Sequence, residues 1–81
     1  MNPRVTLYTR TGCCLCHDAR RILEAARARA PFDYEELDID ADPELRRRYN
    51  EEVPVIAIDG VKAFKYRVEM NEFLKKLAAR R

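Results

Sequence analysis

Three cysteines within four consecutive positions, Cys13, Cys14 and Cys16, are the residues of this sequence best suited to do chemistry. Cys13 and Cys16 form a Cys-x-x-Cys pair, which follows an apolar, β-prone run and opens an amphipathic pattern. Residues three apart share one face of a helix, so the two side chains can meet. A dithiol at a helix start, in a short chain with βαβ patterning, is typical of a thiol–disulfide redox site.

The two sulfurs of this pair are expected to have different roles. Cys13 lies at or before the first helical turn, where unpaired backbone N–H groups and the positive end of the helix dipole favour a thiolate. Cys16 lies one turn further inside, where we expect a more buried thiol. The sequence therefore predicts that Cys13 attacks a disulfide and that Cys16 resolves the resulting mixed disulfide.

Cys14 and His17 leave other interpretations open. Successive helical residues point about 100° apart, so Cys14 cannot share the face of the pair and is expected to be an exposed bystander. A metal ligand or a second redox thiol is the alternative for Cys14. Cys13, Cys14 and Cys16 together raise a competing hypothesis for the whole chain, in which they hold an iron–sulfur cluster or another metal. With His17 they are four ligands on five consecutive residues, which do not easily surround one ion.

The string from Cys13 to His17 is also the attachment signature of c-type haem. Met70 is available as a distal ligand for such a haem. The β-patterned segments fit a cytochrome poorly, so we expect His17 to be a solvent-facing residue of the first helical turn.

The rest of the sequence predicts a mixed sheet that carries helices on both faces, in the order β-α-β-α-β-β-α. Acidic residues on the second strand suggest a sheet edge, and the apolar, β-branched third strand suggests a central position. Asp59-Gly60 predicts a tight hairpin, and Asp42 with Pro43 predicts a helix start. We expect strands at 4–9, 34–39, 53–58 and 61–64, helices at 14–30 and 68–79, and a short helix that starts at Pro43 and buries Leu45 and Tyr49.

Size and composition narrow the class of protein. A chain of 81 residues allows one domain, spanning 1–81. Its composition, with 47% hydrophobic and 37% charged residues, is ordinary for a globular protein. No apolar run reaches membrane-spanning length and no signal peptide precedes the first strand, so we expect a cytoplasmic protein without a membrane partner. Residues 33–52 hold nine acidic and three basic residues, but the net charge of +2 does not suggest nucleic-acid binding.

Val53-Pro54 is the second notable pair, because a proline is out of place inside a central strand. This pair occurs together with the first strand, the Cys-x-x-Cys helix start, the Asp-Gly hairpin and the final helix. With all of these features, the sequence resembles the glutaredoxins over essentially the whole chain. The likeness is closest to the divergent glutaredoxin-like proteins of bacteria. The resemblance implies the α/β thioredoxin fold, with a four-stranded mixed sheet and three helices. It also implies a monomeric thiol–disulfide oxidoreductase that reduces protein or glutathione mixed disulfides.

The resemblance also implies roles for individual residues. Pro54 corresponds to a cis-proline that faces the dithiol, although only about 5–6% of X–Pro bonds in folded proteins are cis. Val53 corresponds to the residue whose backbone pairs with an extended glutathione or peptide substrate. Arg10 occupies the position of a lysine that helps to bind glutathione and to steady the thiolate.

This sequence departs from the glutaredoxin pattern at three places. Cys14-Leu15 stands where Pro-Tyr is usual, Glu52 stands where Thr precedes Val-Pro, and 63–67 replaces the Gly-Gly-x-Asp segment that holds the glutathione carboxylate. We expect no bound cofactor, with glutathione available as a co-substrate, and a partner that is a disulfide-containing protein or glutathione. A redox-inert binding domain with the same fold is the third hypothesis.

Overall fold

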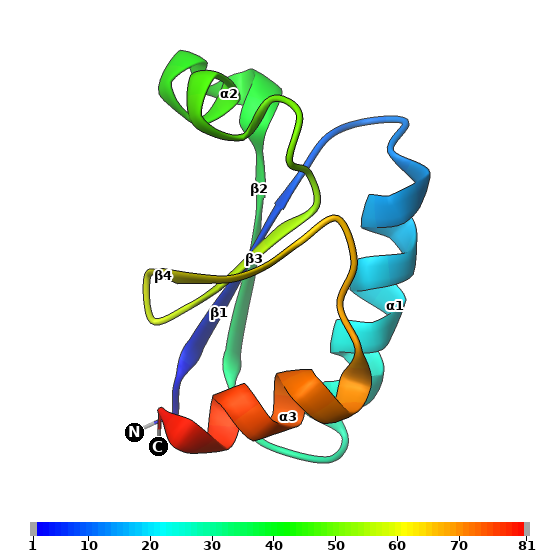
Figure 1. The fold of residues 1–81 in the computed structure, drawn as a ribbon, viewed down its shortest axis with the longest axis vertical. Coiled ribbons are helices and arrows are strands. Elements are labelled where there is room, and N and C mark those ends of the chain that lie inside the picture. The colour runs from blue at the N-terminus through cyan, green and yellow to red at the C-terminus, as the bar shows by residue number, and fades with distance from the viewer. Residues whose placement is uncertain (1, 81) are drawn as a thin grey trace.

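A computed structural model of the chain describes residues 2–80 and shows the predicted order of elements (Figure 1). The strands are β1 (Arg4–Thr9), β2 (Asp33–Asp38), β3 (Val55–Ile58) and β4 (Val61–Lys65). The helices are α1 (Cys14–Arg27), α2 (Pro43–Tyr49) and α3 (Met70–Ala79), with a short 3₁₀ turn, η1 (Ile39–Ala41), ahead of α2. None of the helices within 2–80 is both long and apolar enough to cross a membrane.

The four strands form one mixed sheet in the order β2-β1-β3-β4. β1 runs parallel to β2 and antiparallel to β3, and β4 returns antiparallel beside β3. The acidic strand β2 is an edge and the apolar strand β3 is central, so both sequence-based placements are confirmed. Asp59 and Gly60 join β3 to β4 with φ values of 52° and 83°, as a tight hairpin turn requires.

Two clusters of apolar side chains hold helices on opposite faces of the sheet. Alternate residues of β1 and β3 face the larger cluster, where α1 and α3 pack; it includes Val5, Leu7, Leu23, Ile56, Ile58, Phe73 and Leu77. The smaller cluster places Ile39, Tyr49 and Val55 together, with Tyr8 packed against Tyr49 at a ring-centroid distance of 4.6 Å. Figure 1 also shows that α2 and α3 lie at opposite ends of the sheet, with α2 near the end of β1 that leads into α1.

Several element boundaries differ from the predicted ones. The first helix ends at Arg27 rather than at residue 30, because the N–H of Ala28 turns back to the carbonyl of Ala25 (3.2 Å). β2 lies one residue earlier than predicted, since Ile39 belongs to η1, which the side chain of Asp38 caps. β3 starts two residues later than predicted, after Pro54, which has no N–H for strand pairing.

The start of α3 shows a cap that the sequence reading missed. The carboxylate of Glu69 accepts hydrogen bonds from the N–H groups of Asn71 (3.2 Å) and Glu72 (2.8 Å). Glu69 has an extended backbone, with φ of −113° and ψ of 133°, so α3 begins at Met70 instead of residue 68. Glutamate is an uncommon N-cap, so the sequence does not mark this helix start as Ser, Thr or Asp would.

Candidate active site

A tight turn between β1 and α1 places the first cysteine. The N–H of Cys13 donates to the carbonyl of Arg10 (3.2 Å), and Gly12, with φ of +81°, makes the turn possible. Cys13 then has an extended backbone and occupies the N-cap of α1. The side chain of Cys13 is thereby held beside the unpaired N–H groups of the first turn.

The two sulfurs of the Cys-x-x-Cys pair lie on the same side of the helix start. The Sγ of Cys13 accepts a hydrogen bond from the backbone N–H of Cys16 at 3.1 Å. Cys13 is half-buried, whereas Cys16 is only 1% exposed. One sulfur is thus accessible from outside, and the second lies one turn beneath it.

The environment of Cys16 keeps its thiol protonated at neutral pH. Burial raises the pKa of Cys16, and the hydrogen bond to the Cys13 side chain acts in the same direction. The hydroxyl of Thr9 and the backbone at Arg10 act in the opposite direction. Thr9 was not singled out in the sequence, since it reads there only as the last residue of a strand.

Cys14 and His17 are both exposed. They line, together with Cys13, an open pocket of ≈ 400 Å³ at the start of α1. Within residues 2–80, no group of three or more His, Cys, Asp or Glu side chains is arranged to hold a metal ion.

Arg10 is held by two other segments of the chain. Its guanidinium donates to both carboxylate oxygens of Asp40, each at 2.9 Å. It also donates to the carbonyl (3.1 Å) and the side-chain oxygen (2.6 Å) of Asn50. This hydrogen bonding raises the pKa of Arg10 and lowers that of Asp40. The loop before Cys13 is therefore tied to η1 and to the end of α2.

Asp40 and Asn50 were not identified from the sequence. They lie 30 and 40 residues from Arg10, and no local pattern marks either of them. Only the β-α-β-α order, which brings the end of β1 close to η1 and α2, could have suggested the contact.

The Val53-Pro54 peptide bond is cis. Pro54 is buried, and its carbonyl accepts the N–H of Tyr66 at 2.8 Å. Val53 is half-buried, and no hydrogen bond among residues 2–80 uses its backbone N–H or carbonyl. Glu52 next to it pairs with Lys62 (2.7 Å), which lowers the pKa of this carboxyl. The loop thus offers a free backbone donor and acceptor at Val53.

Comparison with protein families gives one match over most of the chain. The model of the family described as "Glutaredoxin-like domain (DUF836)" matches residues 4–78. The order and pairing of helices and strands are those of the thioredoxin fold. Protein Ne2328 of Nitrosomonas europaea has a solved structure that superposes with a TM-score of 0.83 at 25% identity, covering 95% of this chain and 93% of that one.

Two curated relatives are similar in sequence. Glutaredoxin-like protein NrdH of Escherichia coli is 31% identical over 71 residues, covering 83% of each chain. Rv0508 of Mycobacterium tuberculosis is 32% identical over 63 residues, which is 72% of this chain. That match spans 65% of the length of the mycobacterial protein.

Proposed function

This chain belongs to the glutaredoxin-like domain family, and on that premise we propose that it is a thiol–disulfide oxidoreductase that uses a dithiol mechanism. The observation that supports the proposal most is the placement of Cys13. Its sulfur sits at the N-cap of α1, accepts the N–H of Cys16, and has the buried thiol of Cys16 one turn away. This is the arrangement that a nucleophile and a resolving thiol need.

The proposed reaction transfers two electrons from the dithiol to a substrate disulfide. The thiolate of Cys13 attacks one sulfur of the substrate, forms a mixed disulfide, and releases the other sulfur as a thiolate that takes up a proton. Cys16 then loses its proton and attacks the Sγ of Cys13. The products are the reduced substrate and a Cys13–Cys16 disulfide, which an external dithiol or two thiols must reduce.

The reaction needs no bound cofactor, because the electrons are held in the sulfur–sulfur bond. In a reducing compartment such as the cytoplasm the chain would act as a reductase of disulfides. The free backbone groups of Val53, beside Pro54, would pair with the backbone of an extended substrate. Glutathione and a protein dithiol both remain candidates for the electron donor.

The proposal is tested by trapping the mixed disulfide. In the Cys16→Ser variant the first attack proceeds but the resolving thiol is missing, so the adduct between Cys13 and the substrate should accumulate. Mass spectrometry of the acid-quenched protein, mixed with a disulfide-bonded peptide, should show one attached peptide per chain. The wild-type protein under the same conditions should show the Cys13–Cys16 disulfide and no adduct. An adduct on Cys14 instead of Cys13 would contradict the proposed roles.

The raised pKa of Cys16 predicts the pH dependence of the resolving step. Only the thiolate of Cys16 attacks, so its fraction limits the rate wherever the pH lies below this pKa. The rate of resolution should therefore rise about tenfold for each pH unit between pH 6 and 8. Stopped-flow measurement of peptide release checks this, with the wild-type adduct formed at low pH, where Cys16 is protonated, and then mixed to the test pH. A rate that does not change with pH would show that deprotonation of Cys16 is not limiting.

Two substitutions separate the possible roles of Arg10. We propose that Arg10 positions the loop before Cys13 through its paired contacts with Asp40 and Asn50. Lysine keeps the charge but cannot form the same fork of hydrogen bonds. Arg10→Lys should then lower kcat/KM for disulfide reduction about as much as Arg10→Ala, by roughly three- to tenfold. Recovery of the wild-type rate in Arg10→Lys would instead indicate that the charge alone matters.

A further inference from the structure

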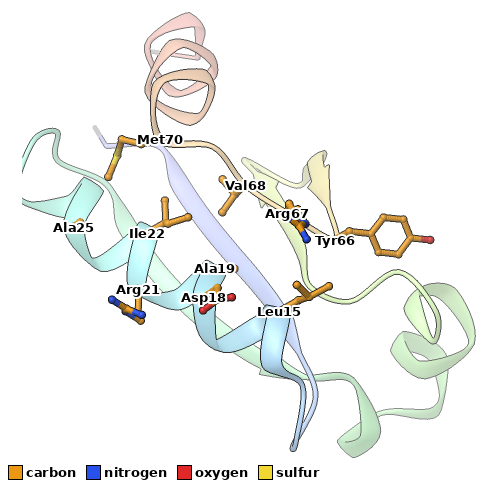
Figure 2. Close-up of a pocket in the computed structure, with 10 residues that line it drawn as sticks. All are labelled: Leu15, Asp18, Ala19, Arg21, Ile22, Ala25, Tyr66, Arg67, Val68 and Met70. Carbon is orange, nitrogen blue, oxygen red and sulfur yellow. The ribbon is translucent and has the colours of Figure 1, made fainter.

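A groove runs along α1, between this helix and the segment that joins β4 to α3 (Figure 2). Its volume is ≈ 550 Å³. One end lies at Leu15, which stands between Cys13 and Cys16 in the sequence. The other end lies at Ala25 and Met70. Leu15 and Ala25 are about 15 Å apart along the helix axis, the length of an extended peptide of about four or five residues.

The groove has an apolar floor that the fold leaves uncovered. Ala19 and Val68 are buried at its base, while Leu15, Ile22 and Met70 are half-buried. Figure 2 shows Ile22, Val68 and Met70 directed into the space between α1 and the 66–70 segment. Apolar side chains of a partner could therefore be removed from water here.

The rim of the groove carries more positive than negative charge. Arg21 and Arg67 are exposed on its two sides, and neither forms an ion pair with any of residues 2–80. Asp18 is the one acidic side chain among the lining residues. Two unpaired guanidinium groups beside an apolar floor favour a partner that combines apolar with acidic side chains.

The groove is structurally joined to the candidate active site. Tyr66, on its wall, has φ of +68°, a conformation that L side chains rarely adopt and that persists where the surroundings fix it. The N–H of Arg67 donates to the carbonyl of Lys65 at 2.8 Å, which closes a tight turn centred on Tyr66. The N–H of Tyr66 itself donates to the carbonyl of Pro54 at 2.8 Å, so the loop that carries the cis-proline contacts the wall of the groove.

We propose that this groove binds the polypeptide next to the reactive cysteine of a protein disulfide, as an extended segment of apolar and acidic residues. The proposal rests on the proposed oxidoreductase function and assigns its substrate class. A tripeptide spans only about 10 Å when extended, so glutathione bound at Cys13 would not fill the end of the groove at Ala25 and Met70. A protein segment of about five residues would reach both the apolar floor and the arginines.

The test compares three mixed disulfides of 5-thio-2-nitrobenzoate, in which the partner thiol is an acidic peptide, a basic peptide or 2-mercaptoethanol. The acidic peptide carries Leu-Leu-Glu-Glu after its cysteine, and the basic peptide carries Leu-Leu-Lys-Lys. Pre-reduced protein attacks the partner sulfur and releases the coloured thiolate. We expect the wild-type protein to react about fivefold faster with the acidic than with the basic peptide.

Two variants with the same change of charge locate the effect. In Arg21→Glu, the rate with the acidic peptide relative to that with 2-mercaptoethanol should fall about fivefold. In Arg29→Glu, an exposed position outside the groove, this ratio should stay at the wild-type value. An equal fall of this ratio in both variants would contradict the proposed binding in the groove. Equal wild-type rates with the two peptides would contradict it as well. If the wild-type protein releases the coloured thiolate from none of the three mixed disulfides, the proposed function itself is wrong.

Discussion

Replacing Cys13 with serine is expected to lower the rate of disulfide reduction by at least about a hundredfold. The hydroxyl of serine is not ionised at neutral pH, and no base in the described structure is placed to activate it, so the attack on the substrate sulfur is lost. The fold should not change, since Cys13 is half-buried and serine is a good N-cap residue. Reduction of a peptide disulfide by stoichiometric, pre-reduced protein measures the effect.

The matched control for this prediction is Cys14→Ser. Cys14 is exposed and contributes no hydrogen bond to the cysteine pair, so this variant should keep a rate within about twofold of the wild-type value. If Cys13→Ser retained full activity, the proposed mechanism would be wrong. If Cys14→Ser lost activity while Cys13→Ser did not, the nucleophile would be Cys14.

The largest expected effect on stability is that of Phe73→Ala. Phe73 is 0% exposed and packs against Phe32 and Phe64, with ring-centroid distances of 5.5 Å and 6.4 Å. Its removal leaves a cavity where α3 meets the sheet, which should lower the free energy of unfolding by about 3–5 kcal/mol. Native domains have roughly 5–15 kcal/mol in total, so this loss removes a large fraction of the stability. Urea denaturation followed by circular dichroism provides the measurement.

Lys75→Ala on the same helix is the control for Phe73→Ala. Lys75 is exposed and forms only a long ion pair with Glu72, at 3.7 Å, so its loss should change the free energy of unfolding by less than about 0.5 kcal/mol. A loss below about 1 kcal/mol in Phe73→Ala would mean that the core around α3 closes over the missing ring.

The sequence was sufficient for the features that depend on local pattern. The alternation of Val5 and Leu7, the hairpin signal at Asp59-Gly60 and the Asp42 cap each indicate one element, and the structure has all of them. Helix ends were predicted less well. The termination at Arg27 and the cap at Glu69 depend on backbone geometry and on a side chain that seldom caps.

The residues alone predicted contacts within the candidate site only between neighbours in the chain, and Val53 and Pro54 were assigned to it through the resemblance to the glutaredoxins. Cys13 and Cys16 meet because of helix periodicity, and their relative exposure also follows from it. The contacts of Arg10 with Asp40 and Asn50 join three separate segments, so no spacing rule reveals them. Tyr66, which lines the groove beside α1, has a left-handed backbone, and the sequence does not indicate this because tyrosine has no preference for that conformation.

The position of β1 in the sheet affects when the chain can fold during its synthesis. β1 leaves the ribosome before β3, with which it pairs, because the residues of β3 follow about 50 positions later, as the pairing of Val5 with Ile58 shows. Until then the nascent chain exposes an apolar strand with one unpaired side. Fragments that stop before β3 should therefore remain unfolded and prone to aggregation, and folding should begin only after most of the chain has been translated.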